Sequence, residues 1–370
     1  MRVLIINVVC GIKSTGRICT ELLNEYQSKG HDVKIAYGRE EVPSEFQDYA
    51  VRIGTDFDVK IHGIKGRILD RCGFGSTRAT KKFLTWVSKY NPDIIWLHNL
   101  HGYYINVKLL FEWIKNHPKV EVKWTLHDCW AFTGHCCYFS MANCMKWKTK
   151  CYNCPEKKSY PNSLILDSSK TNYIDKKEIF NGVHNMTIIT PSYWLADLVK
   201  QSFLNSYPIE VHYNTINKDI FKPTQGNFRK KYGIFRETII LGVAAVWDKR
   251  KGLSDFIKLA EKLDENYKIV LVGLTEKQIE KLPNNIIGIQ RTKDNKELAV
   301  IYSEADVFVN PSREETFGMT TVEAESCGTP AIVYKGTACE EIVKMQGGIA
   351  VEPNVEAIFN AIVKQEYLYK

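Results

Sequence analysis

The amino-acid sequence predicts an α/β protein built from two Rossmann-like domains, each with a parallel sheet covered by helices. Two observations support this prediction. A chain of 370 residues is too long for one ordinary hydrophobic core. Apolar, strand-like runs also alternate with helical stretches along the chain, which is typical of parallel sheets with helices on both faces. The alternation breaks near residues 193–223 and then restarts, so we expect two sheets facing each other across a cleft.

Five apolar runs predict the strands of the first half, and a helix is expected near residues 17–29. Two of these runs are followed by polar residues, where a parallel strand presents its C-terminal edge and where ligands bind in open α/β sheets. The predicted strands are 2–9, 32–38, 93–99, 120–128 and 186–192.

The second half repeats the pattern, with helices expected at 253–263 and 296–303. We therefore assign an N-terminal domain to residues 1–195, an interdomain segment to 196–223 and a C-terminal domain to 224–370. The predicted strands of the second half are 238–247, 267–273, 285–290, 305–312 and 330–336.

The N-terminal residues and the cysteines bear on the cellular compartment. No apolar run is long enough to span a bilayer. The first residues, "MRVLIINVVCG", lack the long apolar core and cleavage site of a signal peptide, so they are interpreted as a first strand. We expect a cytoplasmic protein. Eleven cysteines in a reducing compartment favour metal binding over disulfides.

The net charge of +8 is concentrated between residues 60 and 89. Apolar residues are interleaved with the bases, and such a surface attracts anions such as phospholipid headgroups, a lipid diphosphate or nucleic acid. The alternative is an ordinary solvated helical face. The basic residues are Lys60, Lys65, Arg67, Arg71, Arg78, Lys81, Lys82 and Lys89, against one acidic residue, Asp70.

The stretch "REETFGMTTVEAESCGTPAIV" (313–333) places two carboxylates around the start of a predicted helix near Thr320. Unpaired backbone N–H groups and the positive end of the helix dipole favour a diphosphate there. Gly318 lets the backbone come close to it. Glu315 and Glu323 can accept hydrogen bonds from sugar hydroxyls on either side of the phosphates.

The Glu315–Glu323 pair and its flanks resemble the donor-site signature of retaining GT-B glycosyltransferases of family 4. The segment "DKRKG" (248–252) is similar to that family's phosphate-binding turn, and "HYNTINKDIFKP" (212–223) to its interdomain segment. The resemblance covers nearly the whole chain. It implies the GT-B fold, a nucleotide-sugar donor with UDP as the expected nucleotide, retention of the anomeric configuration, and no catalytic metal.

The resemblance also implies roles for single residues. Lys251 would bind the diphosphate together with the loop and helix start formed by Phe317, Gly318, Met319 and Thr320. Glu323 would bind the ribose, and Glu315 the transferred sugar, where its charge favours an oxocarbenium-like transition state. His127, in "TLHD", matches an active-site histidine of the N-terminal domain and would orient that sugar.

Two positions depart from the family pattern. The arginine expected five residues before the lysine is Val246, so Arg250 is assigned the second positive charge. The N-terminal glycine pair that approaches the donor is replaced by "GIKSTGR", where Gly16 is expected to serve near a helix start.

A dense group of cysteines follows His127, in a predicted insertion at about 129–160. Cys151 and Cys154 form a C-x₂-C pair. Together with Cys144 and either Cys136 or Cys137 they predict a tetrahedral, structural zinc site. The pattern also resembles an insertion in a family 4 subgroup from capsule and exopolysaccharide pathways, and on that resemblance Cys136 is chosen. The alternative is a set of buried free thiols.

The sequence therefore predicts an enzyme that moves a sugar to a lipid-diphosphate-linked or oligosaccharide acceptor during bacterial surface polysaccharide synthesis. It would act at the inner face of the cell membrane, bound to anionic lipid through residues 60–89. Two alternatives are a nucleotide-sugar epimerase and a zinc-containing nucleic-acid-binding protein, although no nucleic-acid-binding motif is present. The D-x-D sequence Asp56–Asp58 resembles a manganese motif but follows no expected strand.

Overall fold

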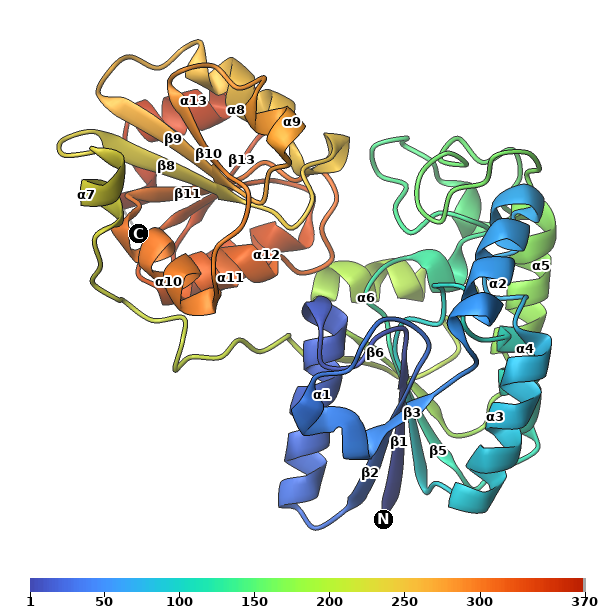
Figure 1. The fold of residues 1–370 in the computed structure, drawn as a ribbon. Coiled ribbons are helices and arrows are strands. Elements are labelled where there is room, and N and C mark those ends of the chain that lie inside the picture. Colours follow the sequence, from blue (N-terminus) through green and yellow to red (C-terminus); the bar gives the residue numbers. More distant parts are fainter. Residues whose placement is uncertain (369–370) are drawn as a thin grey trace. The chain divides into compact units, whose positions relative to one another are not determined.

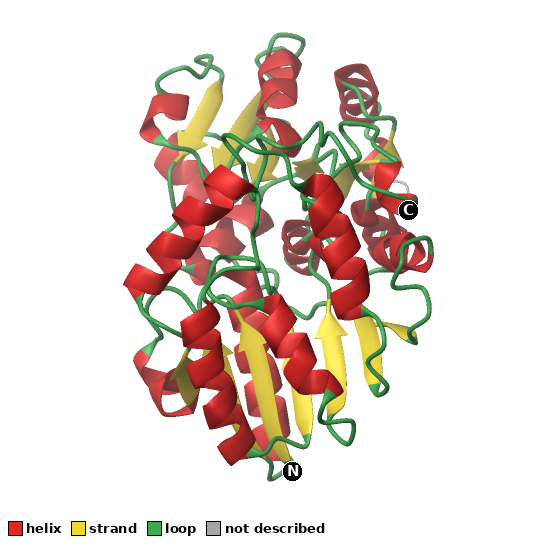
Figure 2. Ribbon diagram, turned by 90° about the vertical axis from the view of Figure 1, so that its right-hand side faces the viewer, coloured by secondary structure: helices red, strands yellow, loops and turns green. Residues whose placement is uncertain are grey.

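The computed structural model describes residues 1–368, which fold into two compact units. The first unit comprises Met1–Tyr213 and the second Asn214–Lys370. Each contains one parallel sheet (Figure 1). Helices cover both faces of the strands, as Figure 2 shows most clearly for the N-terminal sheet.

The N-terminal unit has a seven-stranded sheet in the order β3-β2-β1-β4-β5-β6-β7, and every neighbouring pair is parallel. Its strands are β1 (Arg2–Asn7), β2 (Asp32–Tyr37), β3 (Ala50–Arg52), β4 (Ile94–Leu97), β5 (Glu121–Thr125), β6 (Met186–Thr190) and β7 (Ile209–Val211). Its α-helices are α1 (Lys13–Ser28), α2 (Asp56–Leu69), α3 (Thr77–Tyr90), α4 (Val107–Lys115), α5 (Ser169–Phe180) and α6 (Tyr193–Lys200).

Strand β1 shows how this sheet is buried on both faces. Val3 and Ile5 pack into one hydrophobic cluster with residues of α1 and β2. The alternating residues Leu4 and Ile6 pack into a second cluster with residues of α3 and α4. All four side chains are fully buried. A strand covered by helices on both faces needs a continuous apolar run, which explains the sequence "RVLIIN".

The C-terminal unit has a six-stranded parallel sheet in the order β10-β9-β8-β11-β12-β13. Its strands are β8 (Thr238–Val243), β9 (Tyr267–Val272), β10 (Ile286–Ile289), β11 (Val307–Asn310), β12 (Ala331–Tyr334) and β13 (Ile349–Val351). Its α-helices are α7 (Phe228–Tyr232), α8 (Leu253–Ala260), α9 (Glu276–Ile279), α10 (Asn295–Glu304), α11 (Met319–Ser326), α12 (Ala338–Gln346) and α13 (Val355–Val363).

The interdomain segment that the sequence analysis assigns to 196–223 differs from the structure. Most of α6 and all of β7 lie in this range, and β7 pairs with β6 in the N-terminal sheet. The reason is that β7 has only three residues and lies at the sheet edge, so it lacks the long apolar run of a central strand.

The acidic pair in Asp56–Asp58 has a local structural role at the start of α2. Thr55 and Asp58 form a capping box, in which each side chain accepts a hydrogen bond from the other's backbone N–H. Asp56 pairs with Arg52. Among residues 1–368, no helix combines the length and the apolar character needed to cross a bilayer.

Candidate active site

The loop from β11 to α11 carries most of the predicted donor-site residues. Gly318 precedes α11 with a φ of 97°, in the left-handed region. A Cβ there would lie 2.5 Å from the sulfur of Cys339, so a side chain is excluded. Phe317 is buried below the loop, whereas Met319 and Thr320 at the first turn are half-buried. The first-turn N–H groups can therefore receive an anion.

Lys251 and Glu315 form an ion pair within the C-terminal unit. Lys251 is the last residue of a short turn. Its backbone N–H donates to the carboxylate of Asp248 at 3.0 Å. The side chains of Lys251 and Glu315 are 20% and 14% exposed, respectively. The two predicted donor-site charges thus meet at one place, close enough to act on the same sugar diphosphate.

The predicted phosphate-binding turn (248–252) and the predicted donor loop (313–317) are also joined through Arg250. Its guanidinium donates to the carbonyl oxygen of Glu314 at 2.9 Å, and its own carbonyl accepts from the N–H of Arg313 at 3.0 Å. Gly252 follows with a φ of 75°, and a Cβ there would lie 2.7 Å from the carbonyl oxygen of Pro311. This close contact explains why glycine follows Lys251.

Glu323 lies one turn into α11, and its carboxylate accepts a hydrogen bond from the hydroxyl of Tyr302 at 3.0 Å. Burial and the nearby Glu323 carboxylate raise the pKa of Tyr302 well above its usual value, so the phenol remains a donor. Tyr302 thereby fixes one oxygen of Glu323. Tyr302 could not be predicted as a site residue, because nothing in the sequence pattern of α10 distinguishes it from a core aromatic residue.

His127 follows β5 in the N-terminal unit and contacts a second histidine. Its Nε2 lies 2.9 Å from Nδ1 of His98, which follows β4. Burial lowers the pKa of His127 to about 4 and that of His98 well below its usual value. Both rings are therefore neutral at physiological pH, and one ring donates to the other. His98 was not predicted, although its position directly after the last residue of β4 was a signal for a site residue.

Gly16 lies inside the first turns of α1, rather than just before the helix. It is buried, and a Cβ there would lie 3.1 Å from Val9 and 3.2 Å from the backbone N of Gly11. Gly11 itself has a φ of 73°. The small residue at position 16 therefore lets the β1–α1 loop close onto the helix.

The four predicted zinc ligands lie close together in the cysteine-rich insertion at about 129–160, which we call the excursion. Cys136, Cys144, Cys151 and Cys154 line one small cavity, together with His135. The side chains of Cys136 and Cys154 interact with each other. Cys137 points elsewhere and hydrogen-bonds to Asp128. Within residues 1–368, one group of three metal-binding side chains has ligand atoms that all lie within 4.8 Å of one another. That group contains none of these four cysteines.

We predict that this cysteine group binds about one zinc ion per chain, because dense thiols in a reducing compartment are typical of structural zinc. Elemental analysis of protein purified without chelator tests this. Replacing Cys151 and Cys154 with serine should remove that zinc and lower the thermal midpoint. A double variant as stable as the parent would contradict the prediction.

A third carboxylate of α11, Glu325, has an unusual environment. Burial raises the pKa of its side chain to about 8, although the backbone N–H of Gly348 acts in the opposite direction. The pKa of Glu325 is higher in the folded protein than in the unfolded chain. The protonated carboxyl therefore contributes fully to stability at any pH below the pKa of the unfolded chain. This contribution is lost as the pH rises through about 8.

We therefore expect Glu325→Gln to stabilise the protein more at about pH 8.5 than at about pH 5, by on the order of 1 kcal/mol because the site is partly exposed. Thermal denaturation of both proteins at the two pH values measures this. A variant with the same shift at each pH would show that Glu325 ionises normally.

The second half of the chain matches a known family. Residues 224–366 match the model of the family described as glycosyl transferases group 1. The protein is a glycosyltransferase, and its C-terminal unit matches this family. This glycosyltransferase is 25% identical over 77% of its length to an Escherichia coli K12 protein, WcaC, named as a candidate colanic acid biosynthesis glycosyl transferase, of which 70% is covered. It is 28% identical over 48% of its length to the O-antigen chain mannosyltransferase RfbU of Salmonella typhimurium, of which 50% is covered.

Solved structures show that the glycosyltransferase has the GT-B fold, as predicted. Sucrose-phosphate synthase from Thermosynechococcus elongatus superposes with a TM-score of 0.70 at 16% identity, covering 98% of this chain and 89% of that structure. HepE of Anabaena, solved in complex with UDP, superposes with a TM-score of 0.66 at 14% identity, covering 99% of this chain and 91% of that structure. The family match does not support the alternatives of an epimerase or a nucleic-acid-binding protein.

Proposed function

We propose that this glycosyltransferase transfers a sugar from a UDP-sugar to a lipid-diphosphate-linked glycan, with retention of the anomeric configuration, during bacterial surface polysaccharide synthesis. The observation that carries the proposal is the Lys251–Glu315 pair beside the start of α11, with Glu323 one turn further on. Relatives named for colanic acid and O-antigen synthesis support the polysaccharide assignment, and the UDP complex of HepE supports the nucleotide.

In the proposed reaction, the C-terminal unit stabilises the departing diphosphate. Lys251 and Arg250 supply positive charge, and the first-turn N–H groups of α11 supply hydrogen bonds. Lys251 and Glu315 form an ion pair. Donor binding would therefore divide the pair, with the lysine turning to the phosphates and the carboxylate facing the anomeric carbon.

Glu315 would favour the oxocarbenium-like transition state electrostatically. The departing phosphate oxygen would take the proton of the acceptor hydroxyl, so no dedicated base is required. His127, kept neutral by burial, would orient the sugar by hydrogen bonding. Glu323, held by Tyr302, would bind the ribose hydroxyls.

The proposal also includes reversible binding to the membrane, through a surface that we call the α2 patch. It consists of exposed apolar side chains on α2 and on the loop 164–166. Backbone hydrogen bonds join the two segments: Leu164 N–H donates to the carbonyl of Arg67 at 2.7 Å, and Leu166 N–H to that of Ile68 at 3.1 Å. The α2 patch comprises Phe57, Ile61, Ile64, Ile68, Leu69, Leu164, Ile165 and Leu166.

Exposed bases flank this apolar surface. Lys60, Lys65 and Arg67 lie on α2 itself, and Lys158 precedes the loop. An apolar surface with flanking cations complements an anionic bilayer, where hydrophobic insertion and headgroup attraction act together. The apolar part of this surface does not extend over all of residues 60–89, because Phe83 of α3 is only 4% exposed and belongs to the core.

The decisive experiment is incubation of the purified protein with a panel of radiolabelled nucleotide sugars and lipid-diphosphate acceptors. We expect one donor to give a lipid-linked product whose new bond has the donor's anomeric configuration. Transfer to soluble oligosaccharide alone would contradict the lipid-linked acceptor, and inversion would contradict the retaining mechanism.

A further inference from the structure

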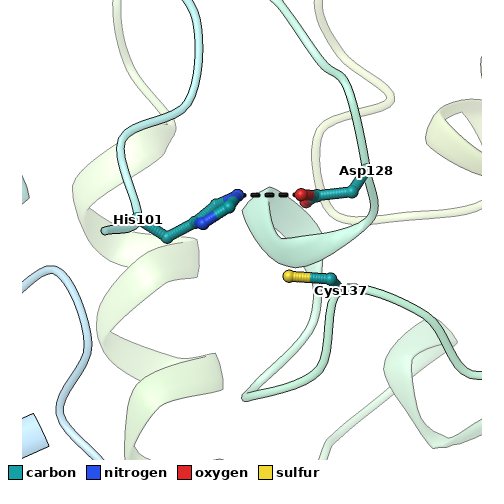
Figure 3. A group of neighbouring side chains, drawn as sticks. All are labelled: His101, Asp128 and Cys137. Atoms are coloured by element: carbon teal, nitrogen blue, oxygen red, sulfur yellow. Dashed lines mark hydrogen bonds and ion pairs between the residues drawn. The ribbon is translucent and has the colours of Figure 1, made fainter. Parts of the chain in front are cut away.

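Three segments of the N-terminal unit each supply one potential metal ligand to a single group (Figure 3). The segments are the loop after β4, the loop after β5 and the cysteine-rich excursion. His101 lies in the loop after β4, Asp128 follows β5, and Cys137 belongs to the excursion. One nitrogen, one carboxylate oxygen and one sulfur all lie within 4.8 Å of one another. Ligand atoms around tetrahedral zinc lie about 3.3–3.8 Å apart, so only a small movement separates this arrangement from a binding geometry.

Two of the three ligands are oriented by hydrogen bonds on their other atoms. Nδ1 of His101 lies 3.2 Å from the hydroxyl of Tyr160, which leaves Nε2 facing Asp128 at 2.8 Å. The second oxygen of Asp128 accepts from the N–H of Trp130 at 2.9 Å. Contacts of this kind fix the tautomer of a ligating histidine and the orientation of a ligating carboxylate. None of the three side chains is more than 13% exposed.

The chemistry of the ligands suits a borderline-soft dication. Imidazole nitrogen, carboxylate oxygen and thiolate sulfur are all zinc ligands. Without metal, Cys137 is a thiol, since burial and the nearby Asp128 raise its pKa well above the usual value. Binding would release the proton of the Cys137 thiol, and the neutral His101 ring would carry its one proton on Nδ1, facing Tyr160. The carboxylate and thiolate then neutralise the two positive charges of the ion.

A neighbouring cation affects this balance. The ammonium of Lys176 is buried and donates to the carbonyl oxygens of Trp130 and Thr133. Its charge favours the thiolate form of Cys137 but also repels an ion, and the two negative ligands offset that repulsion. A cavity of about 10 Å³ beside His101, Asp128 and His127 has room for about one water, which can complete a tetrahedral site.

We propose that His101, Asp128 and Cys137 bind one zinc ion, which holds the β4 loop, the β5 loop and the excursion together next to His127. The ion is structural, and the sugar transfer proposed above does not use it. This site shares no ligand with the group of Cys136, Cys144, Cys151 and Cys154, so the two sites can be tested separately.

The test uses the full chain, freed of metal and titrated with Co²⁺, in the Cys151→Ser/Cys154→Ser background and in the parent. A thiolate bound to Co²⁺ gives a charge-transfer absorption in the near ultraviolet. In the double-serine background, Cys137→Ala should remove this absorption. In the parent, it should lower the amount of bound Co²⁺ by one equivalent per chain. Cys72→Ala is the matched control, because Cys72 is also buried in this unit, and it should keep both.

A milder variant tests the site without removing a ligand. Tyr160→Phe deletes only the hydroxyl that orients His101, and it should weaken Co²⁺ binding by about 10-fold. The proposal is overturned if Cys137→Ala binds as many equivalents of Co²⁺ as Cys72→Ala. It is also overturned if the double-serine background alone removes all bound metal while circular dichroism shows that the protein remains folded.

Discussion

Replacing Glu315 with alanine is expected to lower kcat about 10²-fold while leaving nucleoside diphosphate affinity unchanged or slightly higher. The carboxylate is assigned to the transition state, and one such electrostatic interaction is worth about 10²–10³ in kcat. Its removal also frees Lys251 from its ion pair, so the lysine becomes more available to the phosphates. Glu323→Ala should do the reverse, weakening nucleotide binding about 10-fold, since it loses hydrogen bonds to the ribose.

Calorimetry with UDP and initial rates with the donor identified in the panel separate the two roles. Tyr302→Phe is the control for position, because it keeps the ring and removes only the hydroxyl that holds Glu323. It should weaken UDP binding less than Glu323→Ala does and leave kcat nearly unchanged. Full turnover by Glu315→Ala would show that another group stabilises the sugar.

The central strands of both sheets and the edge strand β10 could be predicted from sequence, whereas the three shortest edge strands could not. Strands such as β1 and β8 are buried on both faces, so they need continuous apolar runs that are visible in the sequence. The edge strands β3, β7 and β13 have three residues each. A run of that length carries no periodicity, and its pairing depends on the neighbouring strand already being in place.

The candidate donor-site residues could be proposed from sequence because they lie within short local segments. Glu315, Gly318 and Glu323 belong to one loop and helix, so their spacing is informative. Tyr302 and His101 were missed for the opposite reason. Tyr302 reaches Glu323 from another helix, and His101 meets Asp128 across 27 residues. Contacts set by tertiary packing leave no spacing pattern in the sequence.

The α2 patch predicts a large effect on membrane binding. Replacing Ile64 and Leu164, which are 60% and 67% exposed, with aspartate should reduce binding to anionic vesicles at least about 10-fold. The change removes two apolar side chains and places negative charge against the headgroups. Both side chains point to solvent, so the thermal midpoint should change little. Sedimentation with vesicles of neutral and anionic lipid measures the binding.

Two triple variants of equal charge distinguish the α2 patch from general basicity. Lys60, Lys65 and Arg67 lie among exposed apolar side chains, whereas Arg78, Lys81 and Lys82 lie on α3, whose Phe83 and Leu84 are buried. Each base near an anionic surface contributes about 1 kcal/mol, so replacing the first set with glutamine should cost about 10²-fold in affinity. The second set should cost less, because the apolar neighbours Phe83 and Leu84 on α3 are buried and cannot insert with these bases into the bilayer. Equal losses from both sets would mean that long-range charge alone attracts the protein. No loss from either would leave α2 as a solvated helix, and the acceptor would have to reach the enzyme by another route.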